Sequence, residues 1–195
     1  MVFLAHVYLS GENDPIKIGN FMADGIHGKN FDEFPIDVQK GIRLHREIDS
    51  YTDFHPIFRQ SKHRLHERYG HYSGVIMDIF YDHFLAKNFS KYSNIPLKKF
   101  SEDFYQVLEE NFEILTPKFQ KILPVLKQEN WMLLYSTIEG LKHILYMMDR
   151  RTKLRSKMQF SIEELLFFYD EFETEFKFFF AEMEEFVAEK LAILG

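Results

Sequence analysis

Histidine and aspartate recur at helical spacing in the first half of the sequence. His45, Asp49 and Asp53 follow one another at intervals of four residues, so on a helix their side chains project from one face, about one turn apart. The chain contains no cysteine, which removes disulfides, thiolate metal sites and cysteine nucleophiles. Any chemistry in this protein therefore uses nitrogen and oxygen atoms as ligands or bases.

Asp78 and Asp82 repeat this interval, and His83 follows directly, within the strongly apolar segment 75–89. Burying ionised carboxylates there costs roughly several kcal/mol unless a cation or firm hydrogen bonds compensate. One His and Asp pair at this spacing is more often structural, but two such pairs on two helices favour a metal site. A mixed set of His and Asp ligands suits Mn²⁺, Mg²⁺, Fe²⁺ or Zn²⁺.

Such a site in a helical protein commonly serves hydrolysis, because the ion lowers the pKa of a bound water and neutralises charge on a phosphoryl oxygen. Di-iron helical bundles are the competing architecture, but they use Glu-x-x-His motifs, which this sequence lacks. Asp78, one turn before Asp82, is left near the water, where it can orient the water, accept its proton or bind a second ion. The spacing therefore favours a metal-dependent hydrolase over an oxidase.

Helices must position these side chains, since no long stretch alternates polar and apolar residues and only nine Gly and six Pro punctuate the chain. The pattern predicts an all-α fold, a single-domain helical bundle over residues 1–195. The expected helices run from Pro15 to about Gly25, from Pro35 to about Asp53, from Pro56 to Tyr69, across 75–89, from Pro96, from Pro117, over 129–148 and from Ser161. Residues 149–159 are expected to form a long loop.

The composition limits the function classes. The 195 residues are 46% hydrophobic and 28% charged, which is typical of a soluble globular protein. A formal net charge of −6 argues against general nucleic-acid binding, which needs cationic neutralisation of phosphates. The opening MVFLAHVYLS has no basic region, and His6 interrupts its short apolar run, so it predicts neither a signal peptide nor a membrane span. We expect a cytoplasmic protein, and its oligomeric state is left open.

Several separated motifs resemble one known family. They are the opening MVFLAHVYLS, IGNFMAD around Asn20 and Asp24, GIRLHREIDSYTDFHP from Gly41 to Pro56, and MDIFYDHFLAKNF from Met77 to Phe89. In this order they resemble the acyl carrier protein phosphodiesterase family, and the likeness continues more weakly to the end of the chain. The resemblance implies a metal-dependent hydrolase, distantly related to the helical HD phosphohydrolases and similar to them in fold. Its expected reaction is removal of 4′-phosphopantetheine from holo acyl carrier protein.

The resemblance also implies which residues act. It places functional weight on His6, Asp24, His45, Asp49, Asp82 and His83, and Asp82-His83 resembles a reversed counterpart of the His-Asp pair of HD enzymes. We expect His6, Asp24, His45, Asp82 and His83 to be metal ligands, with Mn²⁺ as the expected ion. Asp49 and Asp78 are the expected catalytic residues.

Cationic side chains are the candidates for holding the substrate. Arg150 and Arg151 belong to a basic run between Lys142 and Lys157 that only Asp149 opposes, and a basic face would attract an acidic carrier protein. A solvated loop explains such a run equally well. Arg46 lies next to the proposed metal helix face and is a candidate for holding phosphate.

Two other functions remain open from the sequence. A hydrolase of the HD type could act on a small nucleotide or another phosphoester, which assays of both substrates would distinguish. Alternatively, a helical binding protein without catalysis could use the buried Asp and His residues only for structural hydrogen bonds. A chelator would then have no effect.

Overall fold

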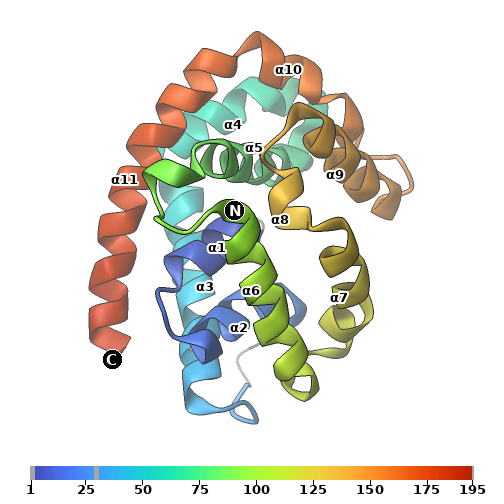
Figure 1. Cartoon of the computed structure of the whole chain (residues 1–195). Helices are drawn as coiled ribbons and strands as arrows, with labels where there is room; N and C mark the ends of the chain where they lie inside the picture. The colour runs from blue at the N-terminus through green and yellow to red at the C-terminus, as the bar shows by residue number, and fades with distance from the viewer. Residues whose placement is uncertain (1–2, 29–30, 195) are drawn as a thin grey trace.

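Prolines and a capping side chain begin the helices that carry the predicted functional residues. Helix α2 (Asp14–Met22) begins after Asn13, whose side chain accepts a hydrogen bond from a backbone N–H of the first turn. Pro35 precedes α3 (Ile36–Phe54), and α4 (Pro56–Tyr69) begins with proline. The computed structural model describes residues 3–28 and 31–194, and within these ranges its regular elements are all helices (Figure 1). The all-α prediction is confirmed.

The other α-helices are α1 (Leu4–Leu9), α5 (Ser73–Lys87), α6 (Leu97–Glu110), α7 (Pro117–Glu129), α8 (Trp131–Leu134), α9 (Ile138–Arg151), α10 (Ile162–Phe167) and α11 (Tyr169–Leu194). Short 3-10 turns are η1 (Ala23–Gly25), η2 (Gly70–Tyr72), η3 (Phe89–Lys91), η4 (Phe112–Ile114) and η5 (Met158–Phe160).

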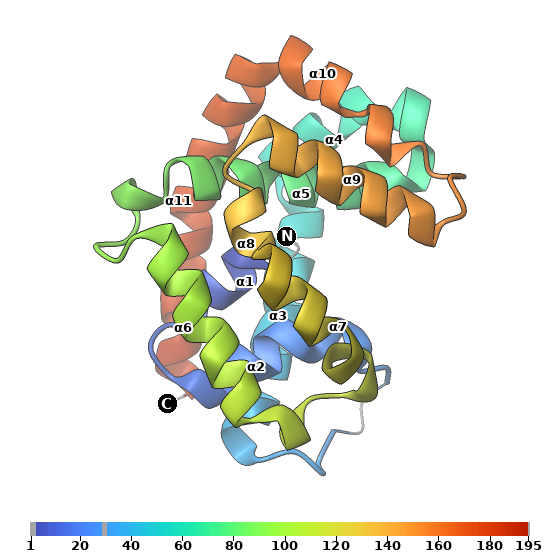
Figure 2. The same cartoon turned by 45° about the vertical axis from the view of Figure 1, so that its right-hand side comes forward.

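Helix α5 lies at the centre of the fold. It is apolar on nearly every side, and α1, α4, α9 and α11 pack around it (Figures 1 and 2). The long helix α11 runs along one side of the molecule past α3, α4 and α5 (Figure 1) and buries Phe172, Phe176 and Phe179. The buried apolar side chains of the described residues form one contiguous core. Any polar group on α5 must therefore find its partners inside this core.

Two glycines let α2 and α3 approach each other closely. A Cβ atom on Gly19 would lie 2.1 Å from the carbonyl oxygen of Val38, and one on Gly41 would lie 2.1 Å from that of Ile16. Since no side chain fits at either position, the two backbones touch. This contact holds the end of α2 against the middle of α3, where His45 is located.

The structure differs from the predicted boundaries in four places. Residues 4–9, for which the pattern predicted no helix, form the buried helix α1. The helix expected over 129–148 is divided into α8 and α9 because Asn130, with φ of 45°, caps the first and Thr137 caps the second. The last helix breaks at Phe168, between α10 and α11. Helix α9 continues to Arg151, which shortens the expected loop.

Helix α11, with 26 residues, is the longest element of the described chain. Glutamates occur along much of its length, between the buried apolar positions. Within residues 3–28 and 31–194, no helix combines the length and the hydropathy needed to cross a membrane.

Candidate metal centre

Three side chains from α1 and α3 converge on one point. His6 projects from α1, and His45 and Asp49 lie one turn apart on α3. Asp49 Oδ1 lies 3.3 Å from His6 Nε2, and Asp49 Oδ2 lies 3.1 Å from His45 Nε2. The two imidazole rings stack with their centroids 4.1 Å apart. Each residue offers a ligand atom within 4.8 Å of the other two, so a single ion can contact all three.

Asn20, near the end of α2, orients both imidazoles. Its Oδ1 atom lies 2.8 Å from His6 Nδ1, and its backbone carbonyl oxygen lies 2.8 Å from His45 Nδ1. Because both atoms accept, each Nδ1 carries a proton, and in its neutral form each ring directs the lone pair of Nε2 toward Asp49. The Asn20 amide group donates to the His6 carbonyl oxygen and to Ser10 Oγ, which fixes the orientation of the amide itself. Proteins hold metal-ligating histidines by hydrogen bonds of this kind.

Asp24 extends the group from the η1 turn. Its Oδ1 atom lies 3.2 Å from His45 Nε2. The side chains of Asp24 and Asp49 are 51% and 44% exposed, whereas His6 and His45 are buried. The group therefore consists of two buried nitrogen atoms with carboxylates on their solvent side.

The two histidines have opposite pKa shifts. Burial, followed by the charge of His45, lowers the pKa of His6 to about 4. Burial also acts to lower the pKa of His45, but hydrogen bonds to Asp24 and Asp49 outweigh it and raise this pKa to about 9. Burial acts to raise the pKa of Asp49, but the hydrogen bond to His45 and the nearby His6 ring outweigh it and lower this pKa strongly. Without a metal at neutral pH, a proton on His45 therefore balances part of the carboxylate charge.

The donor atoms fit a divalent metal ion. His6 Nε2 is buried and makes no hydrogen bond with the described residues, although Asp49 lies close to it. A buried lone pair without a donor is costly, and a cation would satisfy it. Two imidazole nitrogens with one or two carboxylates are ligands that Mn²⁺, Fe²⁺ and Zn²⁺ accept.

Comparison with known proteins identifies the family. The sequence profile of the acyl carrier protein phosphodiesterases matches residues 1–183. The chain belongs to this family. An acyl carrier protein phosphodiesterase from Photorhabdus laumondii is 31% identical over 186 residues, which cover 95% of this chain and 94% of the relative. Proteins of the same name from Pectobacterium atrosepticum and Escherichia coli are each 29% identical, over 94% and 97% of this chain and 95% and 99% of theirs. No solved structure matches the chain.

Membership of the acyl carrier protein phosphodiesterase family makes the chain a hydrolase and confirms the resemblance seen in the motifs.

The structure does not bring Asp82 to the metal group, where the sequence placed it. Its carboxylate accepts hydrogen bonds from the backbone N–H groups of Phe3, Leu4 and Ala5 at 2.9, 3.2 and 3.1 Å. Burial raises the pKa of Asp82 to about 6. Asp82 thus caps α1, the helix that carries His6, and the backbone compensates its burial in place of a metal.

His83 is likewise not among the residues whose ligand atoms converge in the metal group. Its Nδ1 atom lies 2.7 Å from the carbonyl oxygen of Tyr135, and its Nε2 atom lies 2.8 Å from the hydroxyl of Tyr169. Both ring nitrogens are therefore engaged in hydrogen bonds within the core. We do not propose Asp82 or His83 as metal ligands.

Asp78 lies beside the metal group. It lines a cleft of about 240 Å³ together with Asp24, Asp49, Asp53 and Met148. Burial raises the pKa of Asp78 above its ordinary value. The expected position near the reacting water is therefore compatible with the structure, because the same cleft contains Asp49.

The three predicted substrate-binding arginines differ in their relation to this cleft. Arg46 donates a hydrogen bond of 2.7 Å to the Gly28 carbonyl oxygen and stacks over the Phe31 ring. Arg151 contacts the sulfur of Met148 at 3.5 Å, and Met148 lines the cleft. Arg150 is exposed on α9. Arg151 thus contacts one residue that lines the cleft.

Sequence reasoning missed the role of Asn20. Asn20 lies in the resembling motif, but nothing in its spacing shows that it faces two histidines from other helices. A polar residue among Ile18, Phe21 and Met22 was the available signal, since such a residue needs a partner when buried. Asp53, which helical spacing placed on the same face as Asp49, lines the cleft together with it.

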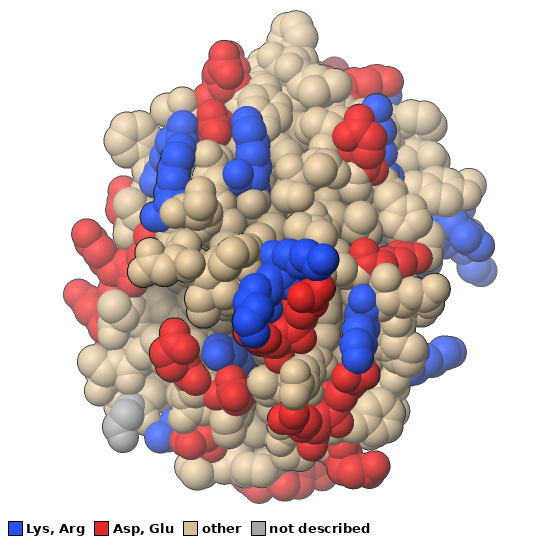
Figure 3. Space-filling view, viewed as in Figure 1, with Lys and Arg blue, Asp and Glu red and all other residues tan. Residues whose placement is uncertain are grey.

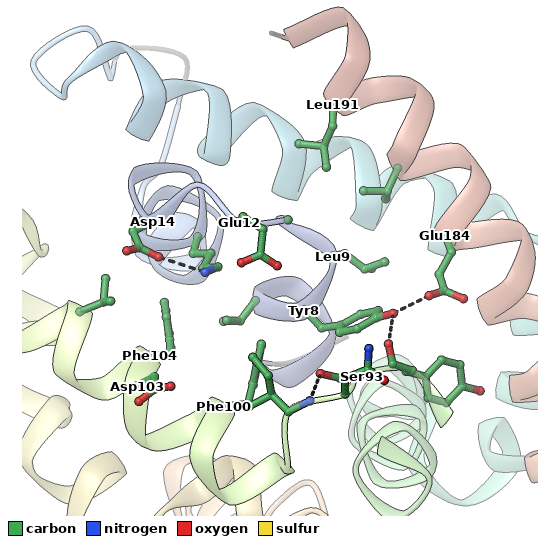
Figure 4. Close-up of a pocket in the computed structure, with 18 of the residues that line it drawn as sticks. Tyr8, Leu9, Glu12, Asp14, Ser93, Phe100, Asp103, Phe104, Glu184 and Leu191 are labelled. Carbon is green, nitrogen blue, oxygen red and sulfur yellow. Dashed lines mark hydrogen bonds and ion pairs between the residues drawn. The ribbon is translucent and has the colours of Figure 1, made fainter. Parts of the chain in front are cut away.

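A larger hollow, of about 650 Å³, lies elsewhere in the molecule (Figure 4). It is lined by α1, α6 and α11, and the Tyr8 hydroxyl lies 2.7 Å from Glu184 and 3.1 Å from the Tyr92 carbonyl oxygen. None of the described residues that line it is a histidine. Size alone would make this hollow the candidate active site. The ligand atoms that converge beside the smaller cleft make that cleft the better candidate.

Proposed function

We propose that this chain is a metal-dependent acyl carrier protein phosphodiesterase that releases 4′-phosphopantetheine from the holo carrier protein. The convergence of His6 Nε2, His45 Nε2 and both Asp49 oxygens on one point carries the proposal. The family supplies the substrate class, since its members are named for action on acyl carrier protein.

His6, His45, Asp49 and Asp24 would hold the ion, which we propose to be Mn²⁺. When bound, the ion would lower the pKa of water and neutralise charge on the phosphoryl oxygens. With the ion bound, Asn20 would hold the remaining proton of each imidazole on Nδ1, so that both Nε2 atoms face the ion. Asp49, expected as a catalytic residue, is better suited to be a ligand because each of its oxygens faces one histidine.

Asp78 would act as the proton carrier. The water oxygen attacks phosphorus, the bond between phosphorus and the carrier protein's hydroxyl oxygen breaks, and that oxygen takes up a proton. The products are a carrier protein with a free hydroxyl group and phosphopantetheine with a terminal phosphate. Asp78 lines the cleft with Asp49, and its raised pKa suits a group that accepts a proton from water and returns one to the leaving oxygen.

Arg46, Arg150 and Arg151 would hold the substrate. The contact of Arg151 with Met148, which lines the cleft, supports a role for its guanidinium group in meeting a phosphodiester that enters there. Arg46 follows His45 directly on α3 and donates a hydrogen bond to the Gly28 carbonyl oxygen. It would contact the substrate beside the loop that contains Gly28.

The test is release of phosphopantetheine, measured by mass spectrometry of purified holo acyl carrier protein with Mn²⁺, with EDTA, and with Mn²⁺ restored. We expect loss of 4′-phosphopantetheine with Mn²⁺ and none with EDTA. A generic phosphodiester and a cyclic nucleotide are assayed in parallel. Cleavage of the nucleotide but not of the carrier protein, or activity that EDTA leaves intact, would contradict the proposal.

A further inference from the structure

A cluster of cations surrounds the C-terminal end of α9. The cluster is called the basic loop below and comprises the exposed side chains of Arg150, Arg151, Lys153, Arg155 and Lys157. Among the described residues, none of these five cations forms a salt bridge. In Figure 3, positively charged side chains project at the right-hand edge, where the end of α9 lies in Figure 1. In a chain of net charge −6, this cluster is a local positive surface.

A buried aspartate fixes the shape of the basic loop. Asp149 is fully buried, and its Oδ1 atom accepts hydrogen bonds from Ser156 Oγ at 2.6 Å and from Thr152 Oγ1 at 3.3 Å. The Asp149 carbonyl oxygen also accepts from the Leu154 N–H at 3.0 Å. These bonds tie the turn to Asp149 at Thr152, Leu154 and Ser156. The cations above it are therefore presented by an ordered turn and not by a solvated coil.

The backbone of this turn is strained. Lys153, Leu154 and Lys157 adopt φ angles of 56°, 61° and 57°, in the left-handed region that residues with a side chain rarely occupy. Asparagine or glycine would relieve this strain, yet the positions hold two lysines and a leucine. Strain of this kind persists where the surrounding structure enforces it, and it is concentrated at functional sites.

The basic loop adjoins the candidate active site. Arg151 contacts Met148, which lines the cleft with Asp49 and Asp78. Exposed apolar side chains lie among the cations: Leu154 is 52% exposed, Phe160 46% and Tyr146 44%. A mixed cationic and apolar surface beside an active site is typical of recognition of a protein.

From these observations we infer that the basic loop is a docking surface for an acidic protein substrate, which carries its phosphodiester past Met148 to the metal group. This inference rests on the proposed function, which identifies the occupant as acyl carrier protein, an acidic protein. Charge complementarity supports this occupant, because five unpaired cations would gain anionic partners when it docks. A small phosphodiester has no acidic surface to offer them.

The experiment compares two charge-reversal variants. K153E/R155E removes two cations of the basic loop without altering Arg151 at the cleft. K91E/K121E is the matched control, with the same change in net charge at two exposed lysines, in η3 and α7, that likewise form no salt bridge with the described residues. Steady-state kinetics with holo acyl carrier protein and with a generic phosphodiester are measured for both at several salt concentrations, together with direct binding of Mn²⁺.

We expect K153E/R155E to raise KM for the carrier protein about tenfold at low salt, with a weaker salt dependence than wild type. Its kcat, its Mn²⁺ affinity and its activity on the small phosphodiester should stay within about twofold of wild type. The control should match wild type on both substrates. An equal loss on both substrates, or a variant indistinguishable from the control, would overturn the inference.

The contribution of the fixed turn is tested by S156A, which keeps every cation but removes the hydroxyl that donates to Asp149. We expect a KM for the carrier protein several times that of wild type, with an unchanged small-substrate rate and circular dichroism spectrum. An unchanged KM would overturn the claim that the turn is preordered.

If wild type cleaves neither substrate, the proposed function fails. Docking is then still tested by measuring, with fluorescence anisotropy, the binding of the carrier protein to wild type and to K153E/R155E.

Discussion

Asn20 contacts each imidazole of the metal group through a different oxygen atom, one in its side chain and one in its backbone. Replacing it with alanine leaves the backbone contact to His45 but removes the acceptor for His6 Nδ1–H. We predict that Asn20→Ala weakens Mn²⁺ binding about 10- to 100-fold, the usual effect of losing such a partner. Electron paramagnetic resonance titration measures this affinity. Nitrogen-15 NMR of the metal-free protein should show His6 losing its preference for the Nδ1–H tautomer.

Ser10→Ala is the matched control for that prediction. Ser10 Oγ accepts a hydrogen bond from the same Asn20 amide but does not touch either ring. Metal affinity close to wild type in Ser10→Ala, beside a loss in Asn20→Ala, would assign the effect to the imidazole contact. Equal losses in both variants would show that Asn20 matters only for packing.

Asp78 has a different expected phenotype from the ligands. We predict that Asp78→Asn lowers kcat about 10²- to 10⁴-fold while Mn²⁺ stays bound, because a proton carrier is lost but no ligand is. The measurement is kcat beside metal content. Asp53→Asn, which changes another carboxylate of the same cleft, is the comparison. Joint loss of metal and activity in Asp78→Asn would instead make Asp78 a ligand.

The candidate site could be predicted from the sequence only in part. His45 and Asp49 followed from helical spacing, which states correctly that they share a face. His6 and Asp24 came only from the family resemblance, because no local pattern connects residues from separate segments. Asp82 and His83 were expected in the group since spacing identifies a helix face but not what faces it. Asp82 in fact meets the backbone of α1, and His83 meets two tyrosines.

At the scale of elements, the glycine contact between α2 and α3 sets the position of Asn20. We predict that Gly41→Ala destabilises the protein by about 2–4 kcal/mol, because its Cβ would lie 2.1 Å from a backbone oxygen of α2 and the helices must separate. Metal affinity should fall as well, since Asn20 would move away from His45. Urea unfolding and Mn²⁺ titration provide the two measurements.

Gly74→Ala in α5 is the control for the helix separation. A Cβ atom there would meet only the far end of Lys62, at 3.8 Å, so alanine should be neutral or stabilise the protein by up to about 1 kcal/mol. If Gly41→Ala behaves like Gly74→Ala, the close contact between α2 and α3 does not control the site.

Element boundaries show where sequence prediction worked and where it did not. Proline marked the beginnings of α3, α4 and α7 correctly, because its fixed φ suits the first turn. The break between α8 and α9 was not visible in the apolar periodicity, which continues across it. Gly140 permits the close turn, since a Cβ there would lie 2.0 Å from the Leu134 carbonyl oxygen. The turn depends on this glycine and on the Thr137 cap, which the hydrophobic pattern does not encode.

For the whole molecule, His45 makes stability depend on pH when no metal is bound. Its folded-state pKa of about 9 exceeds the ordinary value of 6.5, so the folded protein holds this proton more tightly than the unfolded chain. The resulting stability is fully present below pH 6.5 and is lost as the pH rises through 9. We predict a loss of about 1–2 kcal/mol between these values, reduced by solvent screening at the half-exposed carboxylates.

Urea unfolding in EDTA at pH 6.5, 8 and 9.5 measures this dependence, with His45→Gln as the control. The control should have a flatter profile, and a wild-type profile as flat as that of the control would contradict the prediction. Bound Mn²⁺ should reverse the trend, because a ligand nitrogen must lose its proton before the metal binds.

The capping of α1 by Asp82 has a consequence for the order of assembly. A helix of six residues is too short to persist by itself, and its cap lies 77 to 79 residues further along the chain. We therefore expect α1 to become ordered only after α5 has formed and the intervening chain has closed a long loop. His6 reaches Asp49 by the same step, so the metal group is completed late in folding. Capture of the ion would then report that the core has already formed and would not initiate its formation.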